Sequence, residues 1–261
     1  MAAVLALLVG TLAAGPVRAE EVVEVPTRPG QVVRALLIAP PSAKGAVILL
    51  AGGHGNLRLS RDGAIGWGRR NLLVRSRGLF ADAGYVTLVP DMAADLEGTP
   101  LYRATLAHAQ DIGFLVRHLR SMAGSVYLVG ISRAALSVAK AASRLAGAAA
   151  PDAIVIASGQ LMHVDRSQPS VETDIPQIAR IRQPTLLVAH RQDVCAYSMP
   201  SSAAGFRALL TGAQRADVAV LSGGLSGDGE PCGPDSAHGF LGMDGEVVDA
   251  ITRWLEALPP R

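Results

Sequence analysis

Aromatic residues are scarce in this sequence, which has four Phe, four Tyr and two Trp among 261 residues. Single-stranded nucleic acids and sugars stack on aromatic faces, so this scarcity argues against such ligands. An excess of one charge is also lacking, because 24 Lys and Arg stand against 22 Asp and Glu. The densest basic stretch, residues 69–77, holds four arginines that a helix would spread around its surface. We therefore expect no nucleic-acid partner.

Long apolar runs are missing after the N-terminus, so no membrane-spanning helix is expected in the mature chain. Residues 2–14 are apolar or small, and Val17 and Ala19 occupy positions −3 and −1 of a cleavage site. This pattern predicts a signal peptide over residues 1–19, although no Lys or Arg precedes its apolar run. We expect residues 20–261 to form one domain that is secreted or periplasmic.

Motifs for cofactors and metals are also missing. The glycine-rich stretch AGGHGN, residues 51–56, matches neither a Walker loop nor a dinucleotide-binding fingerprint. His163 and Asp165 form an H-x-D pair, which is a poor metal motif without further ligands. We therefore expect no cofactor and no metal.

What the sequence does have is a regular alternation of buried strands and helices. The strands are expected over residues 21–25, 32–39, 46–51, 85–90, 126–130, 153–157, 185–190 and 216–223. The helices are expected over residues 70–83, 105–122, 133–145, 201–210 and 246–258. Continuous apolar strands between helices predict an α/β fold with a mostly parallel central sheet, helices on both faces and an antiparallel N-terminal edge. Only about 26 residues separate Ala157 from Pro184, which leaves no room for a large cap domain.

Ser132 is the first candidate for chemistry. It stands in GISRA, residues 130–134, between a buried strand and a helix, which is the context of a G-x-S-x-G nucleophile elbow. Taken alone, this short pattern is weak and favours a plain helix-start serine. A nucleophilic serine also needs a base and an acid that orients the base.

Asp193 and His238 supply such partners in the chain order expected for this architecture. Asp193 lies three residues after a strand, and His238 lies in a loop between the last strand and the closing helix. Asp91 precedes the serine and Asp235 shares the loop of the histidine, so both fit the role of the acid less well. His190 is expected to be a packed, hydrogen-bonded residue.

The oxyanion hole is expected from two backbone N–H groups. One belongs to Arg133, and the other belongs to Gly53 or His54 in the glycine-rich loop. Asn56 and Trp67 are candidates for the rim of the substrate site. Ordinary packing is the alternative for Trp67.

The only two cysteines, Cys195 and Cys232, predict one disulfide in an exported protein. It would tie the loop of Asp193 to the loop of His238. Two free buried thiols are the alternative.

Three stretches together, VYLVGISRAA, LLVAHRQDVCA and PCGPDSAHGF, resemble the α/β-hydrolase fold superfamily. The sequence is similar in particular to a group of exported, poorly characterised bacterial serine hydrolases, over Ala46 to Leu258. The resemblance implies Ser132 as nucleophile, Asp193 as acid and His238 as base. The sequence departs from the group's pattern at Ala134, where glycine is usual, and at His54 within the glycine-rich loop.

These observations predict a secreted serine hydrolase, a carboxylesterase that acts on small-molecule esters through an acyl-enzyme intermediate. The runner-up is a serine peptidase or amidase. A non-catalytic secreted binding protein on a hydrolase scaffold is the third possibility, although all three triad positions are filled.

Overall fold

Eight strands form one sheet in the computed structural model, which describes residues 19–165 and 167–259. The predicted signal peptide lies outside the described residues except for Ala19. The strands are β1 (Glu20–Pro26), β2 (Val32–Ile38), β3 (Gly45–Leu50), β4 (Tyr85–Pro90), β5 (Val126–Ile131), β6 (Ala153–Ala157), β7 (Thr185–His190) and β8 (Ala216–Leu221).

The sheet has the order β1-β2-β4-β3-β5-β6-β7-β8. β1 pairs with β2, and β2 with β4, in antiparallel register, whereas the remaining pairs are parallel. Every residue of β3, β4, β6 and β7 is buried, as expected for parallel strands covered on both faces. The predicted fold class, with its antiparallel N-terminal edge, is confirmed.

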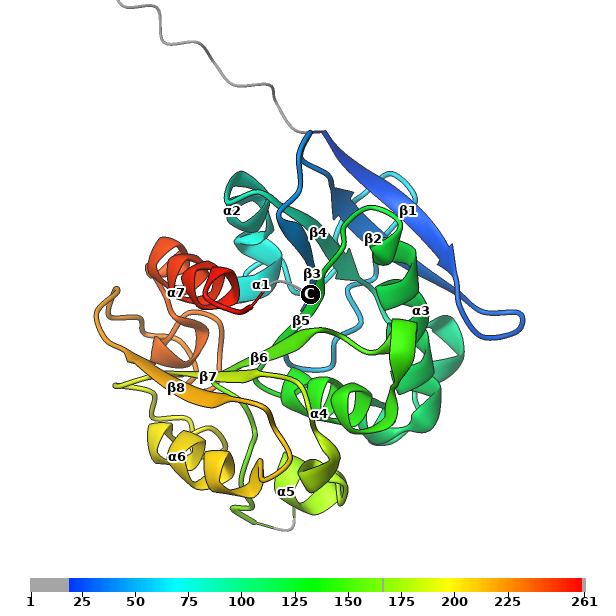
Figure 1. Ribbon diagram of the computed structural model, residues 1–261. Coiled ribbons are helices and arrows are strands. Elements are labelled where there is room, and N and C mark those ends of the chain that lie inside the picture. The colour runs from blue at the N-terminus through cyan, green and yellow to red at the C-terminus, as the bar shows by residue number, and fades with distance from the viewer. Residues whose placement is uncertain (1–18, 166, 260–261) are drawn as a thin grey trace, which may run out of the picture.

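Helices cover both faces of this sheet (Figure 1). One face carries α1 (Leu72–Arg75), α2 (Arg77–Asp82) and α7 (Asp244–Glu256). The other carries α3 (Leu106–Arg120), α4 (Ala134–Arg144), α5 (Val171–Asp174) and α6 (Pro200–Leu209). The four longer helices begin and end within two residues of their predicted bounds.

The single helix predicted over residues 70–83 is wrong, because the segment forms two short helices that meet at Ser76. Ser76 has φ −91° and ψ 4°, outside the helical range, and its hydroxyl donates to the carbonyl of Leu72 at 2.6 Å. A serine hydroxyl that donates to the carbonyl four residues earlier competes with the helical ladder. The break lets both short helices bury apolar side chains, Leu73 in α1 and Phe80 in α2.

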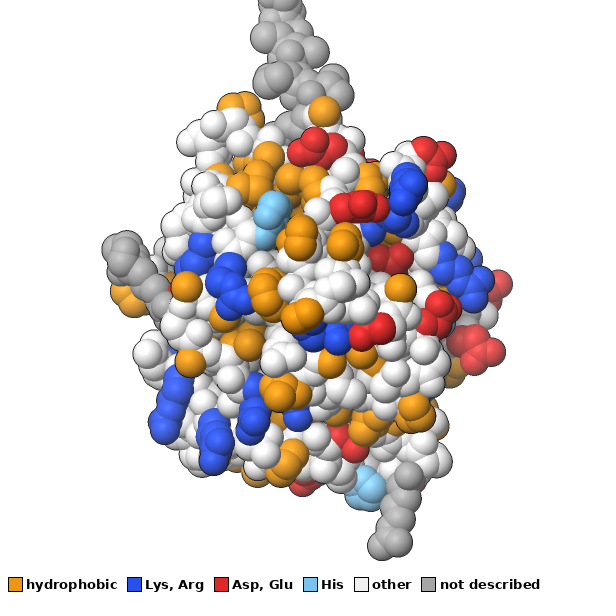
Figure 2. Space-filling model, turned by 90° about the vertical axis from the view of Figure 1, so that its right-hand side faces the viewer, with side chains coloured by type: hydrophobic (Ala, Val, Ile, Leu, Met, Phe, Trp, Pro, Cys, Tyr) orange, Lys and Arg blue, Asp and Glu red, His pale blue; other side chains and the backbone are white. Residues whose placement is uncertain are grey.

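The connection from β6 to β7 contains only α5 and one short 3-10 helix over Ile178–Arg180 among its described residues. No cap domain stands over the sheet within the described ranges, as predicted. In residues 19–165 and 167–259, no helix has both the length and the apolar character needed to cross a bilayer. On the face shown in Figure 2, basic and acidic side chains are both present, with hydrophobic side chains scattered between them.

Candidate active site

Ser132 directly follows β5 and has a left-handed backbone, with φ 57°. Its N–H donates to the carbonyl of Ala157 at 2.9 Å, and its own carbonyl accepts from Ala135 at 3.0 Å. A non-glycine residue in this region is uncommon and is held there by its surroundings. The strand therefore ends in a sharp turn that leaves Ser132 partly exposed at the start of α4.

Small residues around Ser132 make this turn sterically feasible. A Cβ placed on Gly52 would lie 3.0 Å from the Cβ of Ser132, and one on Gly130 would lie 2.6 Å from Val138. Ala134, at the position of the second glycine in the G-x-S-x-G pattern, is completely buried between strand and helix. The methyl group of Ala134 thus fits at this position because Gly130 opposite it has no side chain.

Asp193 and His238 are in contact although 45 residues separate them. Asp193 Oδ2 lies 3.0 Å from His238 Nδ1, and both side chains are almost fully buried. The N–H of Cys195 donates to the other carboxylate oxygen at 2.9 Å. With Asp193 on Nδ1, the second ring nitrogen of His238, Nε2, is left buried and without a hydrogen-bond partner among the described residues.

Ser198 is a further member of this cluster that the sequence reasoning missed. Its hydroxyl donates to Asp193 Oδ2 at 2.9 Å and lies 2.8 Å from His238 Nδ1. It therefore contacts the same nitrogen that faces Asp193, on the side of the imidazole away from Nε2. The sequence holds no signal for this contact, because Ser198 lies in an irregular loop after β7.

The predicted disulfide between Cys195 and Cys232 is present, with the two Cα atoms 4.7 Å apart. Cys195 is two residues beyond Asp193, and Cys232 is six residues before His238. The bond therefore joins the two loops that place the carboxylate and the imidazole.

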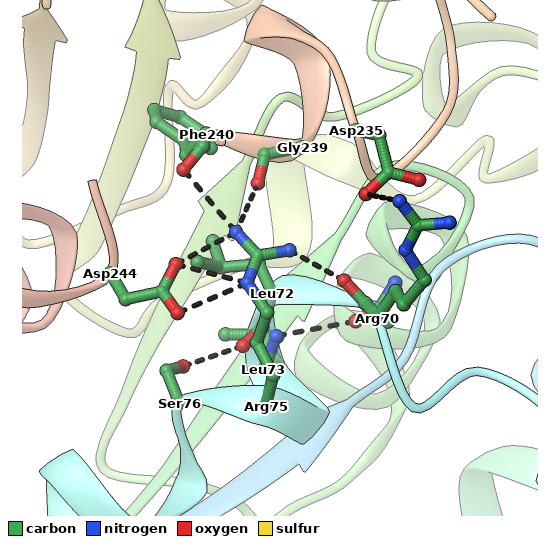
Figure 3. A network of polar contacts seen from close by, with 10 residues as sticks. Arg70, Leu72, Leu73, Arg75, Ser76, Asp235, Gly239, Phe240 and Asp244 are labelled. Carbon is green, nitrogen blue, oxygen red and sulfur yellow. Dashed lines mark hydrogen bonds and ion pairs between the residues drawn. The ribbon is translucent and has the colours of Figure 1, made fainter. Parts of the chain in front are cut away.

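A second set of contacts fixes the histidine loop to α1 (Figure 3). The Arg75 guanidinium donates to the carbonyls of Gly239 and Phe240 at 2.8 and 3.2 Å and pairs with Asp244 at 2.7 Å. Gly239 and Phe240 directly follow His238, so these bonds hold the C-terminal end of the short 3-10 helix Ala237–Gly239, whereas the disulfide at Cys232 lies before this helix in the chain.

The other carboxylates weighed from the sequence have different partners. Asp91 accepts from the N–H groups of Leu57 and Leu59 at 2.6 and 2.7 Å and so shapes the loop after β3. Asp235 pairs with Arg70 at 2.6 Å. Neither has a described contact with the His238 ring.

The predicted packed character of His190 is confirmed. The residue is 2% exposed, and its Nε2 lies 3.2 Å from the carbonyl of Gly223.

The glycine-rich loop after β3 lies beside Ser132. Gly53 has φ 56° and lies under Trp67, since a Cβ on Gly53 would come within 2.7 Å of the indole ring. His54 stacks on the same indole, with ring centroids 3.7 Å apart. In the described part of the chain, no hydrogen bond takes up the N–H of Gly53 or of Arg133.

Arg103 binds the carbonyls of this loop, and the sequence did not predict this role. It is 6% exposed and donates to the carbonyls of Ala51, Gly52 and Gly53 at 2.7, 3.3 and 3.3 Å. By binding these three carbonyls, the guanidinium holds the backbone conformation of residues 51–53. Burial lowers the pKa of Arg103 from its ordinary value.

Gly53 lines two cavities. The first, of about 710 Å³, is lined by Ser132, His238 and Trp67 among others. The second, of about 530 Å³, is lined by Arg133, His54 and Asn56 among others. The structure thus brings the predicted nucleophile and base to one cavity, but no hydrogen bond joins the Ser132 hydroxyl to His238 among the described residues. The predicted rim residues Trp67 and Asn56 line different cavities.

Donor atoms of Asp193, Cys195 and His238 lie within 4.8 Å of one another, as in some metal sites. The sulfur of Cys195 is bonded to Cys232, so it cannot act as a thiolate ligand. This donor set therefore does not fit a metal.

Comparison with known proteins gives a match in fold alone. No protein-family model and no curated protein sequence matches the chain. The dienelactone hydrolase of Anabaena variabilis is similar with TM-score 0.63 and 16% identity, covering 93% of this chain and 99% of that one. The Pyrococcus furiosus esterase Pf2001 has TM-score 0.64 and 15% identity, covering 92% of both chains. XC6422 from Xanthomonas campestris, an α/β serine hydrolase without lid, has TM-score 0.54 and 14% identity, covering 94% and 99%.

These similarities establish that the chain has the α/β-hydrolase fold, as the resemblance of its motifs implied. The fold is that of solved esterases and of a lidless serine hydrolase.

Proposed function

We propose that this protein is a serine hydrolase that cleaves carboxylic esters through an acyl-enzyme intermediate. Ser132 is the nucleophile, His238 the general base and Asp193 the acid that orients the imidazole. The main observation in support of this proposal is that the two ring nitrogens of His238 have different surroundings. Nδ1 contacts Asp193, while the unpartnered Nε2 belongs to a residue that shares a cavity with the Ser132 elbow.

The reaction follows from these positions. His238 Nε2 takes the proton of the Ser132 hydroxyl as Ser132 Oγ attacks the ester carbonyl carbon. The N–H groups of Arg133 and of Gly53 or His54 stabilise the negative charge on the carbonyl oxygen. The protonated imidazole gives its proton to the departing alcohol as the ester bond breaks. Water then attacks the acyl group, gives a proton to Nε2 and releases the acid, and Ser132 regains its proton.

Ser198 is the other serine beside the imidazole, but its geometry suits orientation better than attack. It is 3% exposed, and it contacts Nδ1 and Asp193 rather than the free side of the ring. If the Ser198 oxygen were the nucleophile, its proton would have to pass to His238 Nδ1, the nitrogen that Asp193 already contacts. We therefore assign Ser198 to positioning.

Paired variants test this assignment. Ser132→Ala should abolish turnover of aryl esters while the folded structure, measured by circular dichroism, is unchanged. Ser198→Ala should retain measurable turnover. Full activity in Ser132→Ala, or complete loss confined to Ser198→Ala, would contradict the proposal.

Amide hydrolysis is the second candidate, since the same groups perform it. A panel of chromogenic esters against peptide anilides separates the two, and we expect the esters to be turned over faster. A non-catalytic binding role requires that neither panel is hydrolysed.

We also propose that the chain is exported after removal of residues 1–19. The disulfide between Cys195 and Cys232 supports this, because such bonds persist in oxidising compartments. N-terminal sequencing of the exported protein should give Glu20 as its first residue.

A further inference from the structure

The second cavity, beside the glycine-rich loop, is rich in guanidinium groups. Arg58, Arg103 and Arg133 line it, against one carboxylate, that of Glu97. Glu97 accepts a hydrogen bond from the Asn56 amide at 3.1 Å. None of the three arginines has a carboxylate partner in the described part of the chain.

Arg133 and Arg103 are held by neutral groups only. The Arg133 guanidinium donates to the side-chain oxygen of Gln168 at 2.8 Å. Arg103 donates to the Ser137 hydroxyl and to loop carbonyls, and its buried Nε has no hydrogen-bond partner. A buried guanidinium without a counter-charge is costly, since buried charges are normally paired.

Arg58 is placed at the cavity by an unfavourable backbone. Its φ is 50°, and its N–H donates to the Asn56 side-chain oxygen at 3.0 Å. An arginine in this left-handed region carries strain, which tends to occur at functional sites. Gly66 makes room for it, since a Cβ on Gly66 would come within 2.9 Å of the Arg58 Cβ.

The position of His238 decides which part of an ester reaches this cavity. The departing alcohol must lie on the side of His238, which lines the first cavity. The carbonyl oxygen would lie between the N–H groups of Gly53 and Arg133. Gly53 and Arg133 both line the second cavity, so an acyl chain that leaves the carbonyl carbon on the side away from His238 has this cavity beside it.

The geometry points to half-esters of dicarboxylic acids as the substrate class, with the free carboxylate of the acyl chain bound by the arginines of the second cavity. The inference rests on the proposed function. The exposed Arg58 and the half-buried Arg133 supply the donors, and planar guanidinium groups match a carboxylate with two parallel hydrogen bonds. Burial, with the charges of Arg58 and Arg103, holds the pKa of His54 at the cavity wall below its ordinary value.

Kinetics on three matched esters test the inference. Monobenzyl glutarate carries the free carboxylate, whereas benzyl pentanoate and benzyl methyl glutarate are neutral, and benzyl alcohol release is measured for all three. We expect kcat/KM for the half-ester to exceed both neutral values by about tenfold or more, as for one charge-assisted contact. Equal or lower kcat/KM for the half-ester would overturn the inference.

Two variants and a control locate the effect. Arg58→Gln should lower kcat/KM for monobenzyl glutarate about fivefold more than it lowers kcat/KM for benzyl pentanoate, while Glu97→Gln should raise kcat/KM for the half-ester. Arg61→Gln is the matched control, since Arg61 is 86% exposed and lies beside Glu24. Arg61→Gln should leave kcat/KM for both monobenzyl glutarate and benzyl pentanoate unchanged. An equal effect of Arg58→Gln on charged and neutral esters would contradict carboxylate binding.

Failure of this inference can be told apart from failure of the proposed function. Hydrolysis of benzyl pentanoate without any preference for the half-ester leaves the proposed function standing and removes only the carboxylate site. Hydrolysis of none of the three esters, with no labelling of Ser132 by a fluorophosphonate, removes both.

Discussion

The disulfide between Cys195 and Cys232 joins the loop that carries Asp193 to the loop that carries His238. The acid and the base come from segments 45 residues apart, and their contact depends on both loops keeping their places. Arg75 holds the histidine loop just after His238, through the carbonyls of Gly239 and Phe240. The candidate site is thus fixed by covalent and polar bonds around a small set of side chains.

Removing the disulfide should cost both stability and activity. Cys195→Ser with Cys232→Ser releases a constraint of 37 residues on the unfolded chain, which should lower the free energy of unfolding by about 3 to 4 kcal/mol. We also expect a lower kcat, because the carboxylate and the imidazole lose their common anchor. Urea unfolding and ester kinetics measure the two effects. An unchanged kcat in the folded double variant would show that the bond does not position the site.

The Ser198 hydroxyl should contribute to orienting the imidazole. Ser198→Ala removes a donor to Asp193 Oδ2 and should lower kcat about three- to tenfold, with little change in KM, as for loss of one hydrogen bond to a charged group. Ser198→Thr keeps the hydroxyl and should restore most of the rate. A fluorophosphonate should still label Ser198→Ala. If Ser198→Thr is as slow as Ser198→Ala, the hydroxyl is not the group that matters.

The Arg103 guanidinium should matter for the rate rather than for substrate affinity. Arg103→Met leaves the carbonyls of Ala51, Gly52 and Gly53 without their donor, so the loop's N–H groups lose their orientation. We expect kcat to fall about 10- to 100-fold, somewhat less than for direct loss of an oxyanion donor. Steady-state kinetics with a neutral ester measure this effect. An Arg103→Met enzyme that is folded and has unchanged kcat would contradict the positioning role.

His108 should make the stability of the protein depend on pH. It is buried beside Ser137, with its Nε2 2.9 Å from the hydroxyl, and burial lowers the pKa of His108 to about 3. The unfolded chain therefore takes up a proton near pH 6.5 that the folded chain refuses. Stability from this group is complete above pH 6.5 and is lost as the pH falls toward 3.

His108→Gln should remove this dependence. Between pH 6 and 4 the free energy of unfolding of the native sequence should fall more steeply than that of the variant, by up to about 1.4 kcal/mol per pH unit. Urea unfolding at a series of pH values gives both slopes. Parallel slopes would show that His108 is not the group responsible.

The sequence allowed prediction of the sheet and of the residues at its carboxyl edge. Continuous apolar runs such as the one before Ser132 are typical of buried parallel strands, and the ends of such strands meet at one edge. The chain order of Ser132, Asp193 and His238 singled out the two side chains now seen in contact, Asp193 and His238.

The other features of the site and of the fold could not be predicted, because they depend on tertiary contacts that leave no local pattern in the sequence. Ser198 and Arg103 reach the site through tertiary packing, and neither lies in a recognisable motif. The break at Ser76 arises from a hydroxyl-to-carbonyl bond that competes with a helical period continuing across it. The three arginines of the second cavity come from segments far apart in the sequence, so their common environment is visible only in the folded chain.

The most direct test of the account is to identify the serine that forms the covalent intermediate. The intact protein is treated with a fluorophosphonate, digested, and the modified peptide is sequenced by mass spectrometry. We predict a single adduct on Ser132 and none in Ser132→Ala. An adduct on Ser198, or no adduct in an active preparation, would contradict the assignment of the nucleophile.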